Sequence, residues 1–195
     1  MARHTEGQAA TIKEPEFMRV VAHVRNNSAT PERDVAILQI SYRAGLRAKE
    51  IAGLTIGDIV YEDGSLREVV TLRSAVTKGS KVGKAFLSHP QLRAALEEYV
   101  EIRSKLKSDS SSLFVTQRKA AFTANAMSKL FTKLYKGAGI EGGTSHSGRR
   151  SLASSLIKKK ANIYQVKEIL RHSSIQSTSV YFSEDEDTLC DLLRS

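Results

Sequence analysis

The sequence predicts a single α+β domain that is mainly α-helical and carries one small antiparallel β-sheet. Apolar residues recur at helical spacing through most of the 195 residues, β-branched residues concentrate in one short region, and a Lys-Gly-Ser-Lys turn at 78–81 joins two such segments. A chain of this length can bury one sizeable core. We expect a domain over residues 13–183, after a mobile polar lead over 1–12 and before an acidic segment over 184–195.

Three helices are expected between residues 14 and 54, with a loop after residue 25. Apolar side chains at helical spacing predict an amphipathic helix over residues 14–25. Thr30-Pro31 is typical of a helix start, and the buried helix that follows should end near Gly45. A short helix is expected over 48–54.

The sheet should come next. Residues 66–76 are rich in β-branched types and predict a strand, and residues 82–87 predict the strand that returns after the turn at 78–81. Glycine keeps this turn slim, so Lys78 at its tip can reach a phosphate or a nucleic-acid groove, although solvated turn lysines are also common.

The rest of the chain should be mostly helical. Pro90 follows Ser88 at the start of a long helix, and another helix is expected over residues 123–136. Between them, residues 113–115 predict a brief strand. After residue 143 the chain is expected to be helical almost to its end.

Charge favours a polyanionic partner. Lysine and arginine number 30 against 21 acidic residues, for a net charge of +9, and five of the acids lie within residues 184–195. No apolar run approaches the roughly 20 residues that span a bilayer. The single cysteine, Cys190, excludes an internal disulfide and a cysteine-rich zinc site. We therefore expect a cytoplasmic protein that binds no membrane.

Two pairs of polar residues share a three-residue spacing. His146 and Arg149 would lie on the same side of a helix, and so would Arg47 and Glu50, where the carboxylate can hold the guanidinium in place. The N–H groups at a helix start also attract phosphate. Either pair by itself is equally typical of an ordinary surface interaction.

His172 and Tyr181 are nine residues apart. On one continuous helix they would lie on opposite faces, because nine residues turn through about 900°. Both can face one phosphate only if the helix breaks between them, and Ser173-Ser174 favours the start of a new helix that carries Tyr181. The alternatives are a tyrosine at the edge of the core and a histidine that complements a helix C-terminus.

Taken in order, these residues resemble the active site of the tyrosine recombinases, the phage-integrase family. The resemblance covers roughly residues 14–182 and includes Arg47 after Gly45-Leu46, Lys78 in a hairpin, His146-x-x-Arg149, His172, and Tyr181 nine residues later. Two positions depart from the family pattern: Arg171 replaces the glycine usual before the second histidine, and Gly148 replaces a larger apolar residue.

The resemblance implies a tyrosine-recombinase catalytic domain that cleaves and rejoins DNA without metal or cofactor. The implied catalytic roles are nucleophile for Tyr181, general base for His146, phosphate ligands for Arg47, Arg149 and His172, and proton donor to the leaving 5′-oxygen for Lys78. The product of cleavage would be a 3′-phosphotyrosyl link. Glu50 would hold Arg47, and Lys81, Arg150 and Arg171 are expected to contact DNA.

The resemblance also implies partners: double-stranded DNA at specific sites, a homo-tetramer on that DNA, and accessory DNA-bending proteins, for a protein encoded by a prokaryote, phage or mobile element. The acidic residues 184–195 would dock on a neighbouring protomer or form a disordered end. Most family members carry a further N-terminal DNA-clamping domain, so this is either a natural stand-alone catalytic domain or a truncated piece.

Three other functions are alternatives to recombination. A type IB-like topoisomerase uses a similar site, and a catalytically silent DNA-binding protein could keep the fold. A metal-dependent nuclease is disfavoured because the matched residues are cationic rather than carboxylate-rich.

Overall fold

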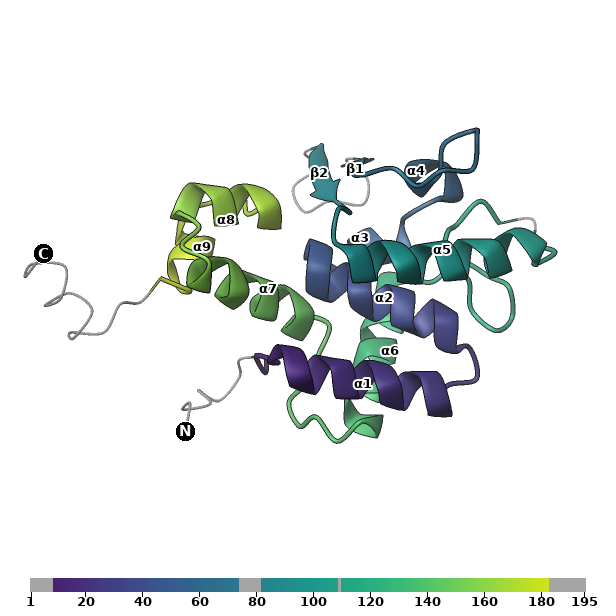
Figure 1. Cartoon of the computed structure of the whole chain (residues 1–195), viewed down its shortest axis with the longest axis horizontal. Coiled ribbons are helices and arrows are strands. Elements are labelled where there is room, and N and C mark those ends of the chain that lie inside the picture. The colour runs from purple at the N-terminus through teal and green to yellow at the C-terminus, as the bar shows by residue number, and fades with distance from the viewer. Residues whose placement is uncertain (1–8, 74–81, 109, 183–195) are drawn as a thin grey trace, which may run out of the picture.

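The computed structural model describes residues 9–73, 82–108 and 110–182, and every structural statement below concerns this part of the chain (Figure 1). Its elements, in order, are α1 (Glu14–Asn27), α2 (Pro31–Ala44), α3 (Ala48–Ala52), α4 (Ile56–Ile59), β1 (Val69–Leu72), β2 (Gly83–Phe86), α5 (Pro90–Lys105), α6 (Ala124–Gly137), α7 (Ser147–Lys158), α8 (Ile163–Leu170) and α9 (Gln176–Ser179).

Helix α2 lies at the centre of the main hydrophobic core. It packs against α1, α5 and α7 (Figure 1). Val35, Ile37 and Ile40 are almost fully buried, because α2 is surrounded by other elements along most of its length. The helix ends at Gly45, whose φ of 63° is left-handed, as the sequence predicts for a glycine at this position.

The sheet is a two-stranded antiparallel hairpin, shorter than predicted. Val69 pairs with Phe86 and Leu72 pairs with Gly83. Val70, Leu72 and Ala85 face the core, whereas Val69 and Phe86 are exposed on the outer side. The turn that joins the strands, with Lys78 and Lys81, lies outside the described residues.

Three local expectations differ from the structure. Residues 113–115 form no strand, since Val115 makes only an isolated bridge with Ala121. Helix α4 was not predicted, because four residues are too few to show a helical period. The described end of the expected mobile lead is packed: Ala10 and Ile12 are buried, and Ile12 N–H donates to Ser151 Oγ at 2.8 Å.

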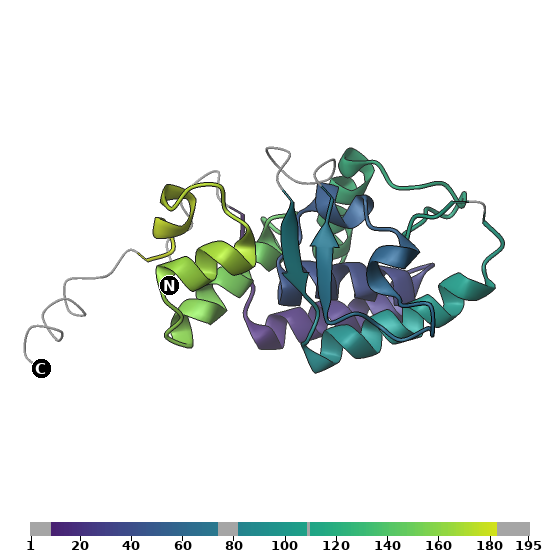
Figure 2. The ribbon, with the colours of Figure 1, turned by 90° about the horizontal axis from the view of Figure 1, so that it is seen from above.

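A second, smaller hydrophobic cluster lies at the C-terminal end of the described chain. Its buried members are Ala153 on α7 and Val166 and Leu170 on α8, with Tyr181 and Phe182 packed against them. Helices α7, α8 and α9 lie together at one end of the molecule (Figures 1 and 2). In the described part of the chain, no helix has the length and hydropathy needed to cross a bilayer.

Candidate active site

Five of the six predicted catalytic residues line one pocket. The pocket has a volume of about 370 Å³. Its lining residues are Ala9, Arg47, His146, Arg149, Arg150, His172, Ser177, Val180 and Tyr181. The sixth predicted residue, Lys78, and the expected DNA contact Lys81 lie outside the described residues. Arg47 and Tyr181 therefore line the same pocket although they are more than 130 positions apart in the sequence.

Arg149 forms the buried floor of this pocket. Its side chain belongs to α7, and the residue is 5% exposed. It donates hydrogen bonds to the carbonyl oxygens of Gly45 and Leu170, which stand at the C-terminal ends of α2 and α8. The C-terminus of a helix carries partial negative charge, so both ends stabilise the guanidinium. Burial, followed by the charges of Arg47 and Arg171, lowers the pKa of Arg149 to about 9, which leaves it cationic at neutral pH.

Gly148 allows α7 to lie close to α2. A methyl group at this position would be 2.7 Å from Ser41 Oγ and 3.0 Å from the backbone nitrogen of Tyr42. Both distances are shorter than an ordinary van der Waals contact. The departure from the family pattern at residue 148 therefore has a structural reason, since a larger side chain would separate the two helices.

Arg47 precedes α3 and is held by Glu50. Arg47 Nη1 lies 2.7 Å from Glu50 Oε1, and Arg47 backbone N–H donates to Glu50 Oε2 at 2.8 Å. The Glu50 side chain is fully buried, whereas that of Arg47 is 21% exposed. Burial alone would raise the pKa of Glu50, but Arg171 and Arg47 hold it below its ordinary value. The carboxylate therefore stays charged, and the pair expected from the three-residue spacing is present.

The two remaining candidate DNA contacts lie in different surroundings. Arg150 lines the pocket and donates to the backbone oxygen of Ala9 at 3.0 Å. The Arg171 side chain is only 8% exposed and is turned inward onto Glu50, at 3.0 Å. A direct DNA contact by the Arg171 guanidinium does not fit this orientation, because its charge is already paired inside the protein.

His172 and Tyr181 lie close together because the helix breaks between them, as predicted. Helix α8 ends at Leu170, and α9 begins only at Gln176. The rings of His172 and Tyr181 are stacked, with centroids 6.3 Å apart and planes 15° apart. One detail differs: Tyr181 follows the short helix α9 instead of lying on it.

Thr178 is a site residue that the sequence did not reveal. It is fully buried, and its Oγ1 lies 2.8 Å from His172 Nδ1. This bond leaves His172 Nε2 available to the pocket. Burial, followed by the charges of Arg149 and Arg47, lowers the pKa of His172 to about 4, so the ring is neutral at pH 7. When the Thr178 hydroxyl donates to Nδ1, the ring proton is on Nε2, where it can be donated to a phosphate oxygen.

His146 stands at the start of α7, on the exposed side of the pocket. Its backbone N–H donates to Thr144 Oγ1 at 3.2 Å. Partial burial, followed by the charges of Arg149 and Arg47, lowers the pKa of His146 below 6.5. The ring is therefore neutral at pH 7, which is the state that a general base needs.

The pocket as a whole is suited to an anion. Arginine and histidine nitrogens converge on it, and no carboxylate is among its lining residues. Elsewhere in the described ranges, no three histidine, cysteine, aspartate or glutamate side chains are grouped so that they could hold a metal ion. A phosphodiester placed here would meet three guanidiniums, two imidazoles and one phenol.

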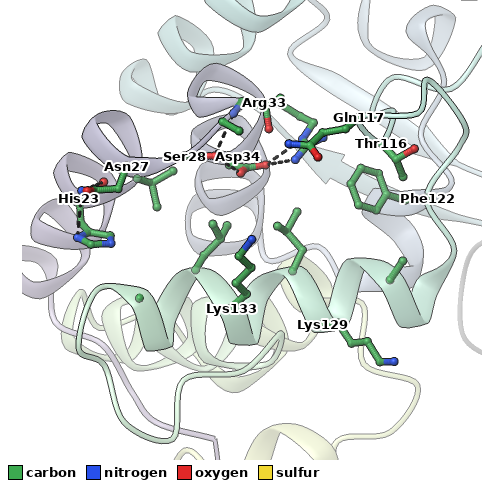
Figure 3. Close-up of a pocket in the computed structure, with 17 residues that line it drawn as sticks. His23, Asn27, Ser28, Arg33, Asp34, Thr116, Gln117, Phe122, Lys129 and Lys133 are labelled. Atoms are coloured by element: carbon green, nitrogen blue, oxygen red, sulfur yellow. Dashed lines mark hydrogen bonds and ion pairs between the residues drawn. The ribbon is translucent and has the colours of Figure 1, made fainter.

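A second, larger cavity of about 560 Å³ lies between α1, α2 and α6 (Figure 3). Arg33 and Asp34 form an ion pair of 2.7 Å at its side, and Ser28 Oγ donates to Asp34 at 2.6 Å. Its apolar walls include Val24, Leu130 and Leu134. Lys133 points from α6 into this cavity (Figure 3). None of the predicted catalytic residues lines it.

Comparison with known protein families gives one match over most of the chain. The model of the phage integrase family matches residues 11–187. Curated relatives include the tyrosine recombinase XerC of Corynebacterium glutamicum, which is 30% identical over 162 residues, or 81% of this chain and 50% of the relative. The XerC of Corynebacterium efficiens is 29% identical over 167 residues, or 83% of this chain and 50% of the relative. The chain thus spans about half the length of the curated relatives it matches.

Solved structures show the same fold and confirm the predicted fold class. The crystal structure of XerA recombinase aligns with a TM-score of 0.76 at 24% identity and covers 98% of this chain and 65% of its own. The Tn1549 transposon integrase in complex with a circular intermediate DNA aligns with a TM-score of 0.78 at 19% identity and covers 100% of this chain and 68% of its own.

Proposed function

The chain belongs to the phage integrase family, and from this premise we propose that it is a tyrosine-type site-specific DNA recombinase that cleaves and rejoins DNA strands. One observation supports this proposal above all others. Arg47, His146, Arg149, His172 and Tyr181, which are scattered along the sequence, line a single cationic pocket. A nucleophile beside several phosphate ligands is the arrangement that covalent strand cleavage requires.

In the proposed reaction, the two arginines bind the scissile phosphate. A guanidinium has five N–H donors, and the carbonyls of Gly45 and Leu170 occupy only two of those on Arg149. The remaining donors can bind the non-bridging oxygens, with Arg47 on the other side. Because Arg149 is fixed before DNA binds, it does not need to reorganise as charge develops on the phosphate. Loss of one such fixed donor typically costs a factor of about 10²–10³ in rate.

Proton transfer accompanies the attack. The Tyr181 oxygen forms a bond to phosphorus, and the bond from phosphorus to the 5′-oxygen breaks. A phenol has a pKa of about 10 in water, so at neutral pH it needs a base, and neutral His146 is the proposed acceptor. His172 donates a hydrogen bond to the phosphate. Lys78 is the proposed proton donor to the leaving 5′-oxygen.

The proposed partner is double-stranded DNA at specific recombination sites, with a homo-tetramer and accessory DNA-bending proteins in the productive complex. Structures of the same fold include XerH bound to its difH substrate and a λ integrase dimer bound to a core site, which supports this choice of partner. Lys81 and Arg150 remain proposed DNA contacts. The XerC relatives are bacterial, which supports a source in a prokaryote or a mobile element.

We further propose that residues 184–195 dock on a neighbouring protomer, in the cavity of Figure 3. The segment carries five acidic residues and three leucines, and the cavity offers Lys133 beside apolar walls. Deletion of residues 184–195 and the variant Lys133→Glu should each weaken assembly on DNA, measured by sedimentation velocity. Unchanged assembly of both variants would exclude this docking.

The main test uses a nicked duplex that contains a candidate site, without divalent metal. Wild-type protein should form an adduct with the DNA that survives denaturation, and Tyr181→Phe should form none while it binds the duplex as before. An adduct that persists in Tyr181→Phe would show that another residue is the nucleophile. If wild-type protein binds the site but forms no adduct, the catalytically silent alternative is correct. Recombination between paired sites, as opposed to relaxation of supercoils alone, distinguishes the recombinase from a topoisomerase.

A further inference from the structure

Arg171 occupies a backbone conformation that usually favours glycine. It follows the last residue of α8 with φ 53° and ψ 46°, which is the left-handed region. A side chain in this region crowds the neighbouring carbonyl group, and glycine avoids this cost. Arginine at this position therefore bears a backbone cost that glycine would avoid.

The Arg171 guanidinium connects several elements. It donates to Glu50 Oε2 on α3 at 3.0 Å and to the carbonyl oxygen of Gly45, which follows α2, at 2.8 Å. It also donates to the carbonyl oxygen of Ile169 on α8 at 2.9 Å and of Lys84 on β2 at 3.3 Å. A single side chain thus joins the hairpin, the C-terminal helices and the segment that carries Arg47.

Two of these acceptors are shared with the arginines of the pocket. Glu50 accepts from Arg47 as well as from Arg171, and the Gly45 carbonyl accepts from Arg149 as well as from Arg171. The backbone oxygen of Arg171 in turn accepts from Arg47 Nη2 at 3.3 Å. Both pocket arginines are therefore one hydrogen-bonded group away from Arg171.

The donors bound to the two oxygens of the Glu50 carboxylate show how Arg171 can influence Arg47. Glu50 Oε2 accepts from the Arg171 guanidinium at 3.0 Å and from the Arg47 backbone N–H at 2.8 Å, whereas Oε1 accepts from the Arg47 guanidinium at 2.7 Å. With both oxygens bound, the carboxylate cannot rotate, and the Arg47 guanidinium is held in one orientation. Two guanidiniums, those of Arg47 and Arg171, pair with this one carboxylate, so the region keeps an excess of positive charge for an anionic ligand.

We propose that Arg171 is a positioning residue, whose guanidinium fixes Glu50 and the Gly45 carbonyl so that Arg47 and Arg149 face the scissile phosphate. This inference rests on the proposed recombinase function for its effect on rate. Its structural part, the immobilisation of Arg47, can be measured without DNA.

The test compares Arg171→Gly and Arg171→Lys with wild type, and uses Lys160→Gly as the matched control. Lys160 is exposed and also has a positive φ, of 60°, so its replacement relieves a similar backbone strain away from the pocket. The rate constant for adduct formation is measured under single-turnover conditions on the nicked duplex, and the Kd for the same duplex by fluorescence anisotropy. We expect Arg171→Gly to lower the rate by about 10- to 100-fold, with Kd changed by less than about threefold.

The control and the lysine variant make the result specific. Lys160→Gly should react like wild type, and Arg171→Lys should restore part of the rate, because lysine keeps the charge but lacks the planar fork of donors. Arg171→Lys also serves as the test variant if Arg171→Gly fails to fold. A rate within twofold of wild type in the folded variants would overturn the proposal.

A second measurement separates this inference from the proposed function. In the free protein labelled with ¹⁵N, the Nη–H signals of Arg47 and Arg149, whose Nη atoms make the hydrogen bonds, should be protected from exchange with water. In Arg171→Gly, the Arg47 signal should shift and exchange at least about tenfold faster. Unchanged Arg47 exchange would overturn the positioning role, even if wild-type protein forms no adduct and the recombinase function fails.

Discussion

Replacement of Gly148 by alanine should disturb both stability and catalysis. The added methyl group would lie 2.7 Å from Ser41 Oγ, 3.0 Å from the Ser41 carbonyl carbon and 3.0 Å from Tyr42 N. Carbon atoms in good contact are about 3.5–4.0 Å apart, so relief of the contacts requires a separation of α7 from α2 by roughly 0.5–1 Å. The Ser41 side chain can rotate away, but the backbone atoms cannot.

The expected magnitude is the difference between two effects. Overpacking of this kind costs about 1–3 kcal/mol, while alanine is favoured over glycine in a helix by up to about 1 kcal/mol. The free energy of unfolding should therefore fall by up to about 2 kcal/mol. His146 lies two residues before Gly148 and Arg149 directly follows it, so a shift of α7 also moves the proposed base and a phosphate ligand. A displacement of about 1 Å can cost on the order of 10²-fold in rate.

The assay combines urea unfolding with single-turnover adduct formation on the nicked duplex. Gly57→Ala is the control, because residue 57 lies in α4, has no heavy atom within 4 Å of the added methyl group, and has no left-handed φ. It should be neutral or stabilising and should react at the wild-type rate. If Gly148→Ala unfolds with the same free energy as Gly57→Ala and reacts as fast, the close approach of α7 to α2 does not position the site.

Four further predictions concern the pocket itself. Arg149→Ala should slow adduct formation by about 10²–10³-fold with little effect on DNA affinity, and it should destabilise the protein by about 1–3 kcal/mol, because two buried carbonyl oxygens lose their donor. An equal loss of affinity and rate would indicate a binding role instead. Thr178→Val should slow cleavage, and Thr178→Ser should restore it, since serine keeps the hydroxyl at His172 Nδ1; ¹⁵N chemical shifts of the ring should show a change of tautomer only in the valine variant. Between pH 4 and 6.5 the unfolded chain binds a proton at His172 more readily than the folded protein does, so the free energy of unfolding should rise with pH in this window, and His172→Gln should flatten the rise. Because the base must be neutral, the cleavage rate should fall on acidification only below pH 6.5, since the pKa of His146 is lowered; a fall that begins well above pH 6.5 would contradict that assignment.

Local sequence patterns predicted much of the fold. The starts of α1 at Glu14 and α2 at Pro31 are those expected, because apolar spacing and a proline at the first turn are local signals. The break between His172 and Tyr181 was also predictable, since helical geometry alone excludes a common face without it. The approach of Arg47 to Glu50 followed from their spacing in the same way.

Contacts between distant segments were not predictable from such patterns. Arg171 appears in the sequence as one more basic residue near the active site, and its inward turn depends on Glu50, which is 121 positions away. Several hydroxyl side chains lie between His172 and Tyr181, and only the three-dimensional structure shows that Thr178 is the one bound to the histidine ring. Ala10 and Ile12 lie in a polar stretch, and their burial depends on partners near residues 142 and 151.

The separation of the two hydrophobic clusters has a consequence for the geometry of the pocket. Tyr181 packs on the small cluster formed by α7 and α8, whereas Arg47 follows the long central helix of the main core. Small structural units open at a lower free energy than whole domains do. Local melting of α8 and α9 would therefore move the Tyr181 hydroxyl away from Arg47 while most of the molecule stays folded. A partner that binds this end of the molecule and keeps it folded would therefore hold Tyr181 in the pocket beside Arg47.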